Sequence, residues 1–494
     1  MSLVQILVIS GVLFILYKFL LHNLGVKQLG IWSLVLATTS ATQIANFGLS
    51  GSVVKFVAKY VARSEDENIS GVVQTAALSL AAFAGCILVI GYPIAKWLLE
   101  LVIVDVYLSL ALSILPYAFL ALWFMMIAGI FKAGLDGYQR FDIRSLLLMG
   151  GAILHLLLCF VFVPIYGLIG VAYARVLVNV LILVSSWLLL KRCLSVLPIF
   201  PYRWNKVLFR EIIGYGINFQ VISITAMLYD PITKALMSKF GGLSMVGYYE
   251  MANRMIQQLR ALIISANQVI VPAIADLEEK SPEKIQSVYS NSYELLFYLA
   301  LPLYSLIIVC VPIISELWVG YYEKDFVFSS ILLSIGWFLN TLTGPAYFVY
   351  LGIGELRWNM IGHIMIGLLN VGLGFMLGIL FNGIGVVVAW VCSLSFGSSI
   401  IYISYHKKYK IPLIELLPKA SRITMIICLI GVLSALIMQQ KFNYNCNAII
   451  LNSIIIFSFS LIIFIPLWLH PMRKRLTAWI TYELLKMKYK AYME

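Results

Sequence analysis

Long apolar stretches follow one another along almost the whole chain, and they limit the folds that the sequence can adopt. A helix needs roughly 18 apolar residues in a row to cross the hydrocarbon core of a bilayer. Hydrophobic residues make up 62% of the 494 residues and charged residues only 12%, too little charge to cover a soluble protein. The sequence therefore predicts an all-α polytopic membrane protein. About fourteen transmembrane helices are expected, near residues 3–21, 31–53, 70–95, 108–131, 145–163, 167–190, 212–236, 246–270, 290–314, 327–350, 359–380, 383–404, 420–438 and 447–469.

Basic residues gather in alternate loops between these stretches. The first three rich segments carry Lys55, Lys59 and Arg63, then Lys132, Arg140 and Arg144, and then Lys191, Arg192, Arg203, Lys206 and Arg210. Loops rich in Lys and Arg stay on the cytoplasmic side, so we expect both termini in the cytoplasm. The net charge of +13 then reflects orientation and anionic lipid headgroups, and we expect no nucleic-acid partner.

The chain contains an internal repeat. Gly25 and Gly30 of LGVKQLGIW correspond to Gly242 and Gly247 of FGGLSMVGYY at a constant offset of 217 residues. Further along, where the register slips slightly, GVAYA at 170–174 corresponds to GVVVA at 385–389. Both copies start on the same side of the membrane, so they are parallel repeats, which transporters commonly contain.

The repeat suggests a domain organisation of two six-helix lobes around a central cavity, followed by two more helices. The expected parts are an N-lobe (1–190), a cytoplasmic linker (191–210), a C-lobe (211–406), the last two spans (407–471) and a basic cytoplasmic tail (472–494). The seventh span has a basic lead, NKVLFREIIGY, that the first span lacks. We therefore expect that further residues precede Met1 in the native protein.

One predicted span carries a polar stripe. At helical spacing Glu250, Asn253, Arg254, Gln257 and Gln268 share a face, with Tyr248 and Tyr249 just before it. Charge in contact with lipid costs several kcal/mol, so this face must meet protein or water. Thr39, Gln43 and Asn46 form a milder stripe on the second span, and the seventh span also carries Asn218.

Three further ionisable residues lie within predicted spans. Asp230 and Lys234 are spaced i, i+4 and are able to pair, and Asp230-Pro231 also resembles a helix start that would break the span. Arg175 lies inside the sixth span. For each there is a purely structural alternative: Glu250–Arg254 as an interhelical lock, Asp230 as a cap or partner of Lys234, and Arg175 bound to a backbone carbonyl.

Signatures of an enzyme are missing from the sequence. We find no Walker A loop, no HExxH, no GxSxG and no acidic cluster with metal spacing, and the longest loops are about twenty residues. The seven cysteines show no CxxC spacing and are expected to be packing residues. We expect no catalysis, no metal and no cofactor.

The order of several short motifs resembles a known family. LGVKQLGIW, NFGLSGSVVKFVAKY, GYYEMANRM, VPAIADLEE and LWVG resemble the polysaccharide transporter branch of the MOP (multidrug/oligosaccharidyl-lipid/polysaccharide) exporters, the O-antigen and capsule repeat-unit flippases. The resemblance covers nearly the whole chain. One departure is Asn46, which stands where relatives often carry an acidic residue.

The resemblance implies a flippase of the bacterial inner membrane. Its cargo would be an undecaprenyl-pyrophosphate-linked oligosaccharide, moved to the outer leaflet by alternating access, with the polysaccharide polymerase and chain-length machinery as further partners besides membrane lipids. Arginine suits a pyrophosphate because it donates paired N–H groups. The expected cavity residues are Arg254, Arg175, Lys234, Glu250, Asp230, Asn253, Gln257 and Tyr249. Coupling to Na⁺ or H⁺ is left open.

Two other transport functions and a non-transporting scaffold remain as alternatives. A cation-coupled multidrug exporter of the same superfamily would use Asp230 and Glu250 as exchanging carboxylates. A lipid II flippase would share the two additional C-terminal helices. A scaffold would need no charged stripe deep within a span.

Overall fold

The computed structural model describes residues 2–40, 48–216, 220–265, 274, 277–278, 280–442 and 448–477. Within these ranges the chain forms fourteen α-helices and three short 3-10 helices, and no strand. Ten helical segments of the described part are long and apolar enough to cross a membrane. The predicted all-α polytopic membrane fold is therefore confirmed.

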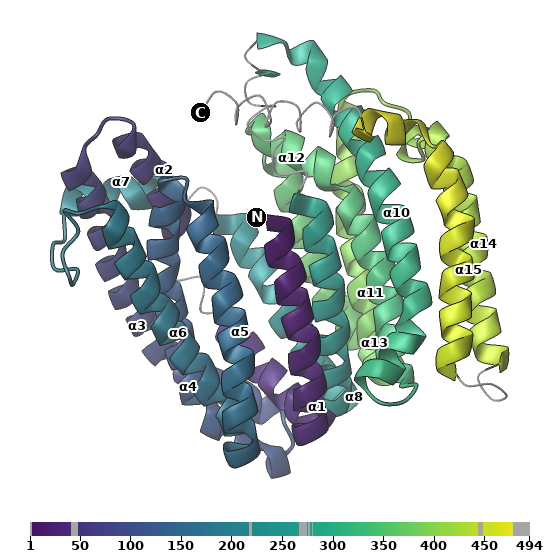
Figure 1. Cartoon of the computed structure of the whole chain (residues 1–494), viewed down its shortest axis with the longest axis horizontal. Helices are drawn as coiled ribbons and strands as arrows, with labels where there is room; N and C mark the ends of the chain where they lie inside the picture. The colour runs from purple at the N-terminus through teal and green to yellow at the C-terminus, as the bar shows by residue number, and fades with distance from the viewer. Residues whose placement is uncertain are drawn as a thin grey trace, which may run out of the picture. The chain divides into compact units, whose positions relative to one another are not determined.

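The chain divides into two compact units. The first comprises residues 1–255 and 363–393. It contains α1 (Ser2–Ser40), α2 (Leu49–Val61), α3 (Asp66–Val102), α4 (Asp105–Gly137), α5 (Phe141–Tyr166), α6 (Leu168–Cys193), α7 (Lys206–Gly216) and most of α8 (Gln220–Ser265), with a central part of α13 (Arg357–Lys408). Within it α4 packs against α2, α3 and α6, and Figure 1 shows α3 to α6 running side by side.

The second unit comprises residues 256–362 and 394–494. Its elements are η3 (Pro282–Lys284), α10 (Ile285–Trp318), α11 (Lys324–Leu342), α12 (Gly344–Gly352), η4 (Leu413–Leu416), η5 (Lys419–Ser421), α14 (Arg422–Phe442) and α15 (Ala448–Leu469). α10 packs against α11, α14 and α15 (Figure 1). Aromatic side chains fill much of the core of this unit, among them Tyr289, Tyr293, Phe297 and Tyr405.

Large apolar side chains also cover the outside of many helices. On α15, Ile454, Phe457 and Leu461 are 58%, 65% and 54% exposed. Surfaces this apolar are rare on soluble proteins and are expected where helices contact lipid. The exposed faces agree with a multi-pass membrane protein.

The internal repeat is visible in the backbone. α1 breaks at Gly25 (φ 77°, ψ 165°) and α8 breaks at Gly242 (φ 75°, ψ 174°), at equivalent positions of the two repeats. Later in the repeat, Gly167 (φ 57°, ψ −135°) separates α5 from α6, and Asn382 (φ 56°, ψ −144°) breaks α13. Such positive φ values favour Gly and, among other residues, Asn. The matched conformations confirm the repeat that the sequence predicts.

The two copies also contact each other through reciprocal glycines. A Cβ on Gly30 would lie 2.0 Å from the Leu243 carbonyl oxygen, and a Cβ on Gly247 would lie 2.4 Å from the Val26 carbonyl oxygen. These contacts are equivalent under the repeat offset, so a pseudo-two-fold axis relates them. Only glycine permits α1 and α8 to approach so closely, as small residues do between membrane helices.

The segment before α7 is held firmly on α3. Gln74 Oε1 accepts hydrogen bonds from the Tyr202 and Arg203 amides at 3.1 and 3.2 Å. Thr75 Oγ1 accepts from the Asn205 amide at 3.2 Å, and the Trp204 indole donates to Ser79 Oγ at 2.9 Å. Much of the predicted linker at 191–210 therefore belongs to the first unit.

Several local predictions are wrong. Asp230-Pro231 does not break its helix, because α8 continues through Pro231 and is interrupted only at Gly242. Lys132 lies within α4, one turn from its end, and not in a loop. Lys55 and Lys59 belong to the amphipathic helix α2, which buries Val53, Phe56 and Tyr60. Some predictions fall outside the described residues. These are the polar positions Gln43, Asn46, Asn218 and Gln268 and the tail beyond residue 477.

Candidate functional site

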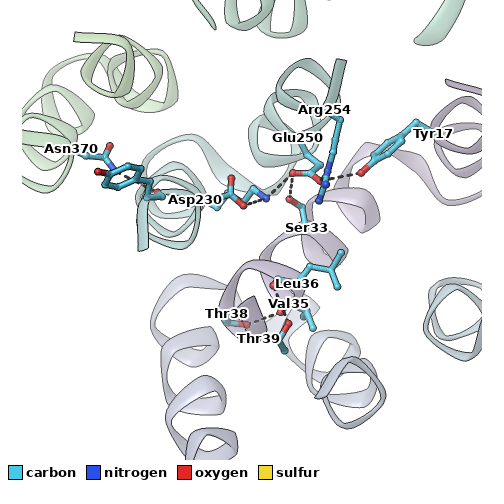
Figure 2. Close-up of polar contacts among 12 residues, drawn as sticks. Tyr17, Ser33, Val35, Leu36, Thr38, Thr39, Asp230, Glu250, Arg254 and Asn370 are labelled. Atoms are coloured by element: carbon cyan, nitrogen blue, oxygen red, sulfur yellow. Dashed lines mark hydrogen bonds and ion pairs between the residues drawn. The ribbon is translucent and has the colours of Figure 1, made fainter. Parts of the chain in front are cut away.

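A buried carboxylate on α8 is the centre of a polar cluster in the first unit. Glu250 is 2% exposed, and each of its oxygens accepts two donors. Oε1 accepts from the Tyr17 hydroxyl at 3.0 Å and from Arg254 Nε at 2.7 Å. Oε2 accepts from the Ser33 hydroxyl at 3.0 Å and lies 2.7 Å from Lys234 Nζ. Figure 2 shows Tyr17, Ser33 and Arg254 converging on this carboxylate.

Lys234 links Glu250 to a second carboxylate. Its ammonium lies 2.5 Å from Asp230 Oδ2 and 2.7 Å from Glu250 Oε2, and the residue is 1% exposed. An isolated buried charge is very costly, but two carboxylates and two cations here balance one another. The cluster therefore carries no net formal charge.

Arg254 also lines a cavity of about 250 Å³ in the same unit, together with residues of α1, α4, α5 and α6. Its polar and charged lining consists of Arg175, Lys132, His155, Asn179, Tyr17 and Trp32 besides Arg254, and the remaining lining residues are apolar. No carboxylate is among the lining residues of this described cavity. The cavity is therefore lined by three cations and no acid.

Two of these cations have no directly paired carboxylate among the described residues. Within the described part of the chain, neither Arg175 nor Lys132 has an ion pair, and Arg175 makes no side-chain hydrogen bond. The nearby carboxylate of Asp136 is instead paired with Arg144 at 2.9 Å. Since the Arg254 charge is shared with Glu250, the cavity retains an excess of positive charge suited to an anion.

Arg254 and Arg175 are the predicted residues that line this cavity. Lys234, Glu250 and Asp230 form the adjoining ion-pair cluster, with both predicted i, i+4 pairs present. Tyr249 is 1% exposed and packs in the interior, and Asn253 Oδ1 is buried without a partner among the described residues. Gln257 lies further along α8, in the second unit, and is partly buried.

Sequence reasoning did not assign Tyr17, Ser33, Lys132 or Asn179 to this site. Tyr17 and Ser33 are ordinary residues of an apolar helix and are 233 and 217 residues from Glu250. The repeat offset could have identified Ser33, because it makes Ser33 the equivalent of Glu250, and equivalent residues beside a two-fold axis contact each other. Lys132 is not among the predicted site residues because the sequence pattern places it in a loop.

Two histidines of the first unit, His363 and His155, contact neighbouring side chains. Tyr229 donates its hydroxyl proton to the His363 carbonyl oxygen at 2.7 Å, and its ring stacks on the imidazole. His155 lies 3.9 Å from the Cys159 sulfur. No group of three potential metal ligands occurs among the described residues.

Solved structures with a similar fold are membrane transporters. An inward-facing multidrug resistance MATE family transporter of the MOP superfamily is 15% identical, with a TM-score of 0.71 over 83% of this chain and 98% of that one. The lipid II flippase MurJ in an inward closed conformation is 15% identical, with a TM-score of 0.63 over 91% and 98%. A MOP superfamily transporter from Pyrococcus furiosus, described as having a binding pocket of reverse polarity, is 15% identical, with a TM-score of 0.59 over 82% and 95%.

These similarities define the class: a multi-pass membrane protein with the fold of the MOP superfamily transporters. A family model described as polysaccharide biosynthesis protein matches residues 1–278, which is more than half of the chain. The chain therefore belongs to this polysaccharide biosynthesis protein family, and the resemblance drawn from the sequence motifs is confirmed. No curated protein matches the sequence.

Proposed function

We propose that this protein is a flippase that moves an undecaprenyl-pyrophosphate-linked oligosaccharide from the cytoplasmic to the outer leaflet of the bacterial inner membrane. Membership of the polysaccharide biosynthesis family supports a role in making a cell-surface polysaccharide. The similar fold of the lipid II flippase MurJ supports a lipid-linked cargo. The alternate basic loops support cytoplasmic termini.

The observation that carries the proposal is the cavity lined by Arg175, Arg254 and Lys132 without a carboxylate. A pyrophosphate is a compact polyanion whose oxygens accept paired N–H donors from arginine. In a low-dielectric site, two cations that form no ion pair attract such a group strongly. Asn179 and Tyr17 add polar groups at the same wall.

The remaining cluster residues act indirectly in this proposal. Lys234 is enclosed between Asp230 and Glu250, so it orders Glu250 and does not itself reach the substrate. Glu250 in turn fixes Arg254 by accepting a hydrogen bond from the arginine Nε. The other predicted residues of α8 lie outside the cation-lined cavity. In this proposal they serve packing or contact sugar hydroxyls: Asn253, Gln257 and Tyr249.

Transport then requires no chemistry, only a change in which side of the membrane the cations face. Parallel repeats related by a pseudo-two-fold axis are a common basis of alternating access. The polysaccharide polymerase and chain-length machinery would receive the exported lipid-linked unit outside.

Multidrug export coupled to a cation is less well supported. It needs an intramembrane carboxylate that is free to exchange a cation. Glu250 is occupied by four donors, and Asp230 is already paired with Lys234 through Oδ2, so that only its Oδ1 is without a partner among the described residues.

The test is to delete the gene and measure which leaflet holds the lipid-linked oligosaccharide, using a non-permeant sugar-binding probe on spheroplasts. We expect the oligosaccharide to accumulate on the cytoplasmic face, with rescue by wild type and not by Arg254→Ala. Normal export with altered drug sensitivity would favour the multidrug exporter, and arrested cell-wall synthesis with normal polysaccharide export would favour the lipid II flippase.

A further inference from the structure

A second polar cavity lies in the second unit, where several helices end. It measures about 440 Å³ and is formed by the start of α10, the end of α13, the connection through η4 and η5, and the start of α14. Its volume is within the range of roughly 300–1,000 Å³ that is typical of ligand pockets. Unlike the cavity in the first unit, this one carries charges of both signs.

One polar group that lines this cavity lacks a partner. Arg422 Nε is buried and makes no hydrogen bond within the part of the chain that the structure describes. His406, by contrast, is satisfied: its Nε2 lies 2.8 Å from the Tyr289 hydroxyl, and its imidazole interacts with the backbone of Ile411 and Pro412. Buried polar atoms are nearly always hydrogen-bonded, so the unpaired Arg422 Nε indicates a place where a ligand binds.

The cavity is lined by charged side chains of both signs. Lys419 begins the short helix η5, and Arg422 begins the 21-residue helix α14 that follows it, where the helix dipole adds partial positive charge. Glu415 and Glu294 supply carboxylates, and Glu294 is already shared with Arg475 at 3.4 Å. Glu415 and Lys419 have no ion pair within the described ranges, so one cation and one carboxylate remain available besides Arg422.

The rim of the cavity is apolar and faces outward. Leu413 and Ile414, on η4, are 50% and 68% exposed, and Ile414 lines the cavity. Apolar side chains beside basic residues are characteristic of segments at the membrane surface. A molecule in this cavity would therefore have its polar part among the charges and its apolar part beside η4.

We propose that this cavity binds the headgroup of an amine-bearing zwitterionic phospholipid of the phosphatidylethanolamine class. The phosphate oxygens accept from Arg422 and Lys419, and the primary ammonium donates to Glu415. The acyl chains lie along Leu413 and Ile414. This lipid site is separate from the proposed transport function and does not depend on it.

The experiment is native mass spectrometry of the purified full-length protein titrated with phosphatidylethanolamine, phosphatidylglycerol or phosphatidylcholine of matched chains. We expect Glu415→Gln to weaken retention of phosphatidylethanolamine by about tenfold while leaving phosphatidylglycerol unchanged. Arg422→Gln and Lys419→Gln should weaken both lipids. The exposed residues Lys407 and Glu283, which do not line the cavity, provide the matched controls Lys407→Gln and Glu283→Gln.

Equal retention of the three lipids, or no effect of Glu415→Gln and Lys419→Gln, would overturn the proposal. If Arg422→Gln does not fold, these two exposed variants still decide the result. Soluble phosphoethanolamine is titrated in parallel, because binding as tight as that of the lipid would show a free phosphate site and contradict the role of the apolar rim.

Discussion

Ser33 and Glu250 occupy equivalent positions of the two repeats, 217 residues apart, and they contact each other directly: the Ser33 hydroxyl donates to Glu250 Oε2 at 3.0 Å (Figure 2). Equivalent residues touch only where they lie beside the axis that relates the repeats. A carboxylate at both positions would place like charges together, which is strongly unfavourable in a buried site. The pairing of a serine with a glutamate thus places one acidic group, and not two, at the axis.

Replacing Ser33 by alanine removes one of four donors to Glu250. A hydrogen bond to a charged group contributes about 1.5–3 kcal/mol, so we expect Ser33→Ala to destabilise the protein by about 1.5 kcal/mol. Chemical unfolding of the purified protein measures this. Ser113→Ala is the matched control because the exposed Ser113 hydroxyl bonds only within its own helix. Equal stability of the two variants would mean that Ser33 does not support Glu250.

The reciprocal glycine contacts predict that both positions reject a side chain. In Gly30→Ala and Gly247→Ala the new Cβ would meet a backbone oxygen at 2.0 and 2.4 Å, and a backbone atom is not able to rotate away. We expect each variant to lose about 1–3 kcal/mol or more of stability. Gly11→Ala is the control, since no atom lies within 4 Å of a Cβ there. Similar thermal stability of the three variants would contradict the close approach of α1 and α8.

Asp230→Asn separates the flippase from the cation-coupled exporter. Lys234 keeps its contact with Glu250 at 2.7 Å after this change, although the cluster then holds two cations and one carboxylate. We expect oligosaccharide export to stay within about threefold of wild type, whereas an exporter that exchanges a cation at Asp230 would lose its transport. The leaflet assay in the deletion strain measures this, with Glu67→Gln, an exposed carboxylate at the start of α3, as the control.

His470, just beyond α15, predicts a pH dependence in the second unit. Its Nδ1 accepts from the Met472 amide at 3.2 Å and its Nε2 lies 3.0 Å from Ser421 Oγ, an arrangement that requires the neutral ring. Burial lowers the pKa of His470 below its ordinary value of 6.5, although Glu294 opposes this shift.

The unfolded chain takes up this proton more readily than the folded protein. The contribution of His470 to the free energy of unfolding is therefore full above pH 6.5, and it is lost as the pH falls from 6.5 through the lower pKa of the folded state. We expect wild type to lose more stability than His470→Gln between pH 8 and pH 5, measured by thermal unfolding. The same loss in both proteins would show that His470 stays neutral or exposed.

Much of the fold was predictable from the sequence because its determinants are local. Apolar run length identifies the spans, and the positive φ of Gly25 and Gly242 follows from glycines placed one repeat apart. The pairs Asp230–Lys234 and Glu250–Arg254 follow from i, i+4 spacing on a helix. The offset also relates Gly30 to Gly247, but which backbone atoms they meet depends on how the helices pack.

The rest of the site was not predictable because tertiary packing decides it. Tyr17 reaches Glu250 only through the packing of α1 on α8. Lys132 was assigned to a loop because sequence alone does not show how far α4 extends past its apolar run. The i, i+4 spacing of Asp230 and Lys234 did not show that Lys234 is also enclosed by Glu250, which removes it from the cavity surface.

The central claim is that Arg175 and Arg254 hold the pyrophosphate of a lipid-linked cargo, and the most direct measurement is calorimetric binding of short prenyl ligands to the purified protein. Arg175 is the best residue to change because no ion pair within the described residues is lost with it. We predict that farnesyl pyrophosphate binds more tightly than farnesyl monophosphate or farnesol. Arg175→Gln should weaken the pyrophosphate by about tenfold and leave farnesol unchanged. Equal binding of the three ligands, or an Arg175→Gln protein that binds the pyrophosphate as wild type does, would contradict the account.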